Sequence, residues 1–205
     1  GSMHLRGLKG FTPLHYAAWM GHTAVVRRLL ACTPVDIKAT GKETPLMFAA
    51  QGNTATMALL LEAGADIEAV SRFGCTPLDF SVTKGILENI RFLLEAGANP
   101  NTDYEDMGPP IGMAAQDIPE CMDRDKIAII RLLLEYGADI NLPCKENGAT
   151  AIYYAICAKD ARLVRFLLEN GAHANCRFHD KFTMRDIARI VEAPELIDLL
   201  QEYGQ

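Results

Sequence analysis

The chain has 205 residues, of which 49% are hydrophobic and 22% are charged, so it has enough apolar side chains for a buried core and does not resemble a disordered protein. Its formal net charge of −6 argues against a general nucleic-acid-binding protein. No apolar run approaches the roughly 20 residues that a membrane-spanning helix needs, and no signal peptide is recognisable.

One short opening recurs along the chain. Thr-Pro-Leu begins at Thr12, Thr44 and Thr76, and more divergent copies begin at Pro109, Thr150 and Thr183. The successive spacings are 32, 32, 33, 41 and 33 residues, so only the fourth interval departs clearly from the period. A period of this length is typical of stacked repeats, each of which buries its apolar face against its neighbours. The sequence therefore predicts six helical units.

Each unit has the same internal order. The threonine suits a helix N-cap. Proline suits the next position, because the backbone N–H that it lacks would have no partner in the helix. A second helix is indicated by aliphatic residues at helical spacing, as in Val25, Val26, Leu29 and Leu30. We expect the second helix to end at a glycine with a left-handed backbone, followed by a polar stretch that suits a projecting hairpin. The glycines in question are Gly64, Gly97, Gly137 and Gly171.

These units resemble ankyrin repeats. The resemblance is carried by the segments at residues 12–18, 21–22, 94–99 and 134–141, and it extends from about Leu5 to the C-terminus. It implies an all-α repeat solenoid of helix-turn-helix units with projecting hairpins, whose concave face binds other proteins. The histidine of the opening is present only as His15. It is replaced by Met47, Asp79, Gly112, Tyr153 and Asp186 in the later copies, which puts the usual bond from that histidine to the next repeat in doubt there.

The repeat register also divides the chain. Residues 1–3 are interpreted as a tag remnant and residues 4–205 as a single repeat domain, with units starting near 12, 44, 76, 109, 150 and 183. The long fourth interval predicts an extended inter-helix turn at 116–125. Charged residues in the last unit favour a C-terminal cap at 183–205. At the other end, we expect that repeats before the first unit were removed, with coverage of this edge by another surface as the alternative.

No pattern in the sequence indicates catalysis, and we expect no catalytic residues, cofactor or metal site. There is no G-x-S-x-G, no phosphate-binding glycine-rich loop and no metal-ligand spacing among the histidines and cysteines. The six cysteines are scattered without a C-x-x-C pair. They therefore favour reduced thiols and a location in the cytosol or nucleus.

The resemblance also supplies a register for partner binding: the residues just before each opening and those seven to eight positions after it. This register selects candidates in the first and third units, among which Trp19 is the only tryptophan of the chain. Tryptophan is the residue type most enriched at binding hot spots. The alternative is that these side chains pack against neighbouring hairpins. The candidates are Phe11, Trp19, Met20, Arg72, Phe73 and Lys84.

A second group of candidates lies in an acidic stretch of the sequence. Between Asp103 and Lys126 the local charge balance is −5, and both the hairpin and the long turn of the fourth unit contribute to it. Such a surface would attract a protein or peptide rich in lysine or arginine. A merely solvated acidic loop is the alternative. The candidates here are Asp103, Tyr104, Glu105, Asp106 and Asp117.

These observations favour a monomeric, non-catalytic protein-recognition module that binds neither nucleic acid nor membranes. The alternative is a targeting or substrate-recruiting domain excised from a larger enzyme or effector. A purely structural spacer would instead carry an evenly charged groove without Trp19, Phe73 or the acidic cluster.

Overall fold

The computed structural model describes residues 10–102, 108–118, 124–179 and 181–204. Within these ranges the chain forms twelve helices and one short two-stranded hairpin. The predicted fold class, an all-α repeat protein, is confirmed. The helices group into two compact units, residues 1–99 and 100–205, and each is described by itself.

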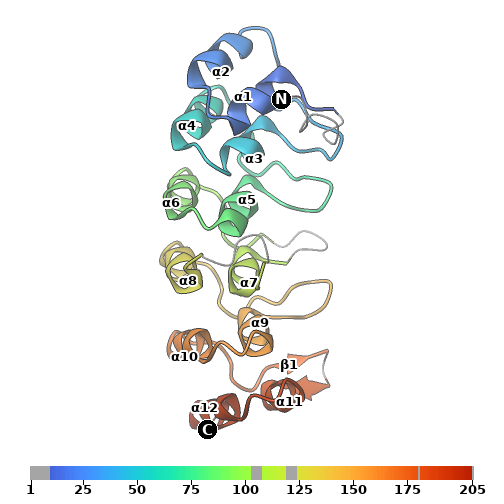
Figure 1. Cartoon of the computed structure of the whole chain (residues 1–205), viewed down its shortest axis with the longest axis vertical. Coiled ribbons are helices and arrows are strands. Elements are labelled where there is room, and N and C mark those ends of the chain that lie inside the picture. The colour runs from blue at the N-terminus through green and yellow to red at the C-terminus, as the bar shows by residue number, and fades with distance from the viewer. Residues whose placement is uncertain (1–9, 103–107, 119–123, 180, 205) are drawn as a thin grey trace, which may run out of the picture. The chain divides into compact units, whose positions relative to one another are not determined.

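The first unit holds three helix pairs. The first helices of the pairs, α1, α3 and α5, form one layer, and α2, α4 and α6 form the other (Figure 1). Loops project from the first-helix layer between successive pairs. The helices are α1 (Pro13–Trp19), α2 (Thr23–Leu29), α3 (Pro45–Ala49), α4 (Thr54–Glu62), α5 (Pro77–Lys84) and α6 (Leu87–Glu95).

The second unit repeats this arrangement, with α7, α9 and α11 in one layer and α8, α10 and α12 in the other. Strands β1 and β2 form an antiparallel hairpin before α11, in which Arg177 pairs with Thr183 and Phe178 with Phe182. The elements are α7 (Pro110–Ala115), α8 (Lys126–Glu135), α9 (Ala151–Cys157), α10 (Ala161–Glu169), β1 (Arg177–Phe178), β2 (Phe182–Thr183), α11 (Met184–Ile190) and α12 (Pro194–Glu202).

The helix openings show why these residues start helices. The first helix of each pair begins one residue after the threonine or proline of its opening. At the third opening, the Asp79 carboxylate accepts bonds from the Thr76 N–H at 2.7 Å and from the Thr76 hydroxyl at 2.8 Å. Asp186 and Thr183 make the same two contacts at the sixth opening. Each pair thus satisfies a backbone donor at the start of its helix.

His15 makes the contact to the next repeat that the resemblance to ankyrin repeats implies. Its Nε2 lies 3.1 Å from the carbonyl oxygen of Glu43, in the loop before α3. Its Nδ1 faces Thr12, 3.2 Å from the backbone nitrogen. Where aspartate replaces this histidine, as at Asp79, the side chain likewise binds the threonine of its own opening.

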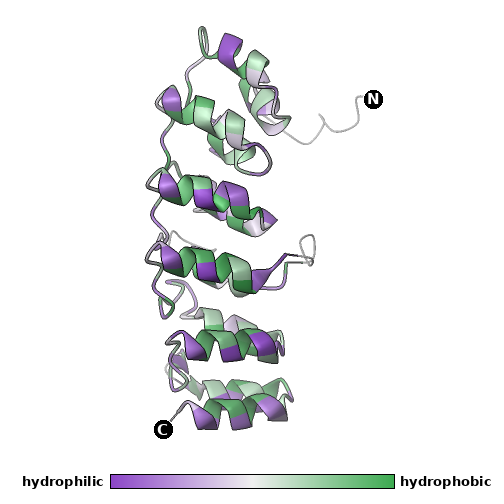
Figure 2. Ribbon diagram, turned by 90° about the vertical axis from the view of Figure 1, so that its left-hand side faces the viewer, coloured by the Kyte–Doolittle hydropathy of each residue, from purple (hydrophilic) through white to green (hydrophobic). Residues whose placement is uncertain are grey.

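Packing within each unit rests on the helix faces between the two layers. The second helices are amphipathic, and Figure 2 shows hydrophilic and hydrophobic residues alternating on their outer side. In α10, for example, Leu163, Val164 and Leu167 are buried, while Arg162 and Arg165 are exposed. All four glycines expected to end second helices have positive φ angles, between 85° and 96°, as predicted.

Asparagine side chains tie successive loops of the second unit together. Asn101 donates to the Gly137 carbonyl oxygen at 2.9 Å and accepts from the Asp139 N–H at 2.7 Å. Asn141 repeats this pattern with Gly171 and His173 at 3.0 and 2.8 Å. Each asparagine therefore satisfies backbone groups of the next repeat, and the two asparagines occupy equivalent positions in their repeats.

Candidate partner-binding site

Trp19 lies at the C-terminal end of α1 with 41% of its surface exposed. The ring of Tyr16 meets it edge to face, with 6.4 Å between centroids, and the neighbouring Met20 is 49% exposed. The opposite face of α1 is buried through Leu14 and Ala18, among others. Trp19 therefore lies outside the buried core of α1, with part of its indole at the surface.

Phe73 lies in the loop before α5 and is 55% exposed. The Arg72 guanidinium lies over its ring, 5.6 Å from the centroid. The Arg72 N–H donates to the Gly41 carbonyl oxygen at 2.7 Å, and the Ser71 hydroxyl accepts from the Cys75 N–H at 3.1 Å. These bonds hold the loop to its neighbour and fix Phe73 at the surface. Lys84, at the end of α5, is also exposed.

Phe11 lies in a different environment from Trp19 and Phe73. Its ring meets Phe48 edge to face at 4.5 Å between centroids, and the His15 ring lies 5.4 Å away. Because Phe11 is half-buried among these rings, its surroundings favour the packing alternative.

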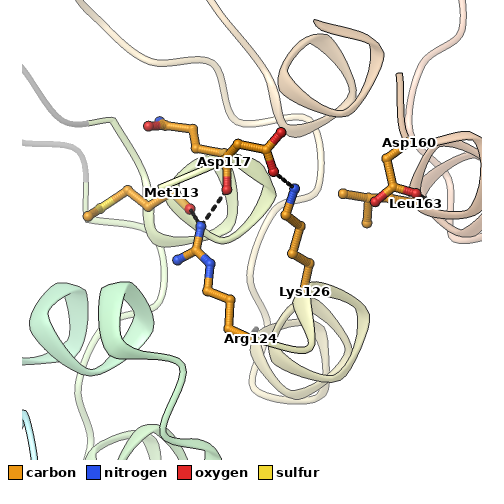
Figure 3. A network of polar contacts seen from close by, with 7 residues as sticks. Met113, Asp117, Arg124, Lys126, Asp160 and Leu163 are labelled. Atoms are coloured by element: carbon orange, nitrogen blue, oxygen red, sulfur yellow. Dashed lines mark hydrogen bonds and ion pairs between the residues drawn. The ribbon is translucent and has the colours of Figure 1, made fainter. Parts of the chain in front are cut away.

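Four of the five candidates from the acidic stretch, Asp103, Tyr104, Glu105 and Asp106, fall outside the described residues. Asp117, the fifth, is exposed and forms an ion pair with Lys126 (Figure 3). Asp125, nearby, caps α8 by accepting from the Ala128 N–H at 3.0 Å. The charge of Asp117 is therefore partly balanced within its own unit.

Arg124, two residues before the start of α8, contacts the C-terminal end of α7. Its guanidinium donates to the carbonyl oxygens of Met113 at 2.9 Å and Gln116 at 2.5 Å (Figure 3). These acceptors belong to the C-terminal end of α7, where carbonyl groups lack helical partners. Arg124 thus caps α7 from the segment that leads into α8.

The described residues contain no group of three or more histidine, cysteine, aspartate or glutamate side chains placed to hold a metal ion. Cys32, Cys75, Cys144, Cys157 and Cys176 are free thiols. Burial, and then the charge of Asp79, raises the pKa of the Cys75 thiol to about 12. Cys75 is therefore a protonated core side chain at neutral pH rather than a nucleophile. Across the ranges that the structure covers, no helix is both long and apolar enough to traverse a bilayer.

Comparison with known families settles what the repeats are. A family model of three ankyrin repeats matches residues 33–104 and 120–180, and a single-repeat model matches residues 9–42. The chain belongs to the ankyrin repeat family. Ankyrin repeat domains are generally protein–protein interaction modules.

The chain spans a quarter or less of the two curated relatives named here. The ankyrin repeat protein nuc-2 of Neurospora crassa is 30% identical over 170 residues, which cover 81% of this chain and 15% of nuc-2. The bovine mitochondrial disaggregase is 28% identical over 184 residues, which cover 87% of this chain and 25% of that protein. The crystal structure of the human ASB11 ankyrin repeat domain matches with a TM-score of 0.75 and 27% identity, covering 95% of this chain and 85% of the other.

The ankyrin register did not select one aromatic cluster in the second unit. Tyr153, in α9, stacks on Phe178 with 4.2 Å between centroids and an 18° angle between the rings, and Tyr154 and His179 lie beside this pair. Burial is the main cause that raises the pKa of Tyr153 to about 12. Tyr153 occupies the position that is histidine in the ankyrin pattern. This replacement was the one sequence feature that could have indicated the cluster.

Proposed function

We propose that this ankyrin repeat chain recognises a partner protein or peptide through the first unit, with Trp19 and Phe73 as apolar anchors. The supporting observation is that both large side chains are exposed, although the apolar residues of the neighbouring core are buried. Trp19 ends a first helix and Phe73 lies in an inter-repeat loop, and these parts are free of core packing.

The charge preference of the partner is a separate part of the proposal. A ligand segment rich in lysine or arginine would be attracted by the acidic residues Asp103, Glu105 and Asp106, in a cytosolic or nuclear setting. The charged residues next to Phe73 and at the end of α5 are cationic instead, namely Arg72 and Lys84. The apolar anchors and the acidic residues therefore need separate tests.

The apolar part is tested with a Trp19→Ala, Phe73→Ala variant, with Ile190→Ala as the control. Ile190 is 63% exposed in α11 and has no place in the proposed site. Partners captured from lysate by the wild type and the control should be lost by the double variant. Affinity for a purified partner should fall by roughly 30-fold or more, because hot-spot truncations cost about 2 kcal/mol or more. Equal affinities for all three proteins, with unchanged melting curves, would overturn the proposal.

The electrostatic part is tested by replacing Asp103, Glu105 and Asp106 with the corresponding amides. Binding of the same partner should weaken at low salt, and raising the salt should weaken wild-type binding because exposed charges are screened. Unchanged low-salt affinity would reject a basic ligand while leaving the apolar anchors in place.

A second candidate is an ankyrin module that recruits a substrate or partner to a catalytic part elsewhere in a longer protein. Its support is the bovine mitochondrial disaggregase, of which the chain covers only 25%. The size of the endogenous protein on an immunoblot tests this candidate. A band at the 22.5 kDa of this chain would contradict it.

A further inference from the structure

The second unit has a groove on the outer side of its second helices, away from the loops and first helices considered so far. This groove, with a volume of about 530 Å³, runs across α8, α10 and α12. These three helices face the viewer in Figure 2. Its apolar lining comes from Ile127, Ala161, Phe166 and Leu199, and its charged lining from Arg131, Arg162, Arg165, Glu169 and Glu195.

Three arginines converge on this groove from two helices. The Arg131 guanidinium lies over the Phe166 ring, 5.1 Å from its centroid, which positions the guanidinium beside the apolar lining. Arg162 and Arg165 are both exposed and lie one helical turn apart in α10. Among the described residues, no carboxylate is within ion-pairing distance of Arg162 or Arg165.

Two aspartates beside the groove are engaged in other contacts. Asp160 accepts from the Leu163 N–H at 2.9 Å as the N-cap of α10, and Asp117 pairs with Lys126. These two aspartates line an adjoining hollow of about 340 Å³, which Ile127 and Arg162 share with the groove. Only Glu169 and Glu195 oppose the three arginines within the groove itself.

We infer that this groove is a second binding surface, which takes an acidic peptide that also carries an apolar side chain. A carboxylate of the peptide binds Arg162 and Arg165, and its apolar side chain lies against Phe166 and Leu199. Arginine suits this role because its planar guanidinium donates paired hydrogen bonds to a carboxylate.

The composition of the groove favours this ligand over a phosphate chain. A polyphosphate or nucleic acid would place repeated charge against Glu169 and Glu195 and would leave the apolar lining unused. A peptide that mixes one or two carboxylates with an apolar residue satisfies both parts of the surface. This surface is independent of the anchors Trp19 and Phe73, which belong to the first unit.

The test is a peptide-display selection from a random library, with wild-type protein as bait and the Arg162→Glu, Arg165→Glu variant for counter-selection. Peptides that depend on the two arginines should be enriched in aspartate or glutamate together with leucine, isoleucine or phenylalanine. Enrichment of basic peptides, or no peptides that depend on these arginines, would overturn the inference.

Fluorescence anisotropy with a labelled selected peptide then measures the effect. Affinity should fall at least tenfold in the double variant and when the peptide's acidic residues become amides. The matched control is Arg27→Glu, because Arg27 follows Val26 in α2 as Arg165 follows Val164 in α10, but it lies in the first unit. This control should bind like wild type. Tighter, arginine-dependent binding of a labelled oligouridine would instead identify a phosphate site and reject the peptide.

Discussion

At the scale of single residues, the fifth and sixth repeats place Lys159 and Glu192 at a left-handed backbone position that is glycine in the first and third repeats. Lys159 has a φ angle of 54° in the turn between α9 and α10. In the first repeat the same position is Gly21, with a φ angle of 69°. A side chain in the left-handed region costs roughly 1–2 kcal/mol, because its Cβ crowds the following carbonyl oxygen. Lys159 is exposed, so its side chain contributes little packing in return.

Lys159→Gly should therefore stabilise the chain. Glycine removes the steric cost but gains more freedom in the unfolded state, so we expect the free energy of unfolding to rise by about 0.5–1 kcal/mol. Urea unfolding monitored by circular dichroism measures this change. Lys159→Ala is the matched control, since alanine keeps the Cβ and should give no comparable gain. If both variants are equally stable, backbone strain at this position is not the cause.

At the scale of elements, the end of α7 depends on one side chain from the following turn. Arg124→Ala would remove both hydrogen bonds to the carbonyl oxygens of Met113 and Gln116. Bonds from a charged donor contribute about 1.5–3 kcal/mol, so we expect a loss of that order in the free energy of unfolding. Hydrogen exchange should speed up in α7 and at the start of α8.

Arg124→Lys provides the control for this prediction. Lysine keeps the charge, but its side chain is shorter and lacks the planar guanidinium whose Nη2 donates to both carbonyl oxygens. Its stability should fall between those of the wild type and Arg124→Ala. Unchanged exchange in α7 for the alanine variant would show that this helix end does not depend on Arg124.

The elements also show what sequence alone could predict. Helix starts and stops were predictable because they depend on local chemistry, such as Thr76 before a proline or Gly97 after a second helix. The stacking of Tyr153 on Phe178 depends on how α9 approaches a loop of the next repeat, which no local pattern encodes. For the same reason, the sequence alone could not show whether Phe11 packs against Phe48 or is exposed to a partner.

At the scale of the whole molecule, the family and the helical fold followed from the period, because six copies in phase reinforce one another. The candidate site followed only in part. The register selected Trp19 and Phe73, both of which are exposed, and their role in binding stays a prediction. The groove across α8, α10 and α12 brings together side chains from three repeats. Spacing within any single repeat therefore could not indicate it.

The chain as a whole should lose stability on acidification through one group in each unit. Burial lowers the pKa of His15 from its ordinary value of 6.5, although the nearby Glu43 opposes this shift. The contacts agree with a neutral ring, because Nδ1 faces the Thr12 N–H as an acceptor while Nε2 donates to the Glu43 carbonyl. Hydrogen bonds from the Thr183 hydroxyl and backbone, and then the charge of Arg189, lower the pKa of Asp186 from 3.8.

Both shifts act in the same direction but in different pH ranges. The unfolded chain binds a proton at His15 below about pH 6.5 while the folded chain does not, so stability decreases from that pH down to the lowered folded pKa. Asp186 contributes stability above pH 3.8, which is lost as the pH falls from there through its lowered folded pKa. Each unit of pKa lowering corresponds to about 1.4 kcal/mol for a buried group such as His15.

His15→Met separates the two ranges. Methionine does not titrate, and Met47 already takes this position in the second repeat, where its sulfur lies 3.4 Å from the Thr44 nitrogen. Urea unfolding from pH 8 to pH 3 should show that the stability difference between wild type and variant is constant above about pH 6.5 and shifts against the wild type below it. Replacement of the exposed His22 by glutamine should leave the wild-type profile in place. Parallel profiles for the wild type and His15→Met would show that His15 protonates equally in the folded and unfolded chain, and that its burial does not hold the ring neutral.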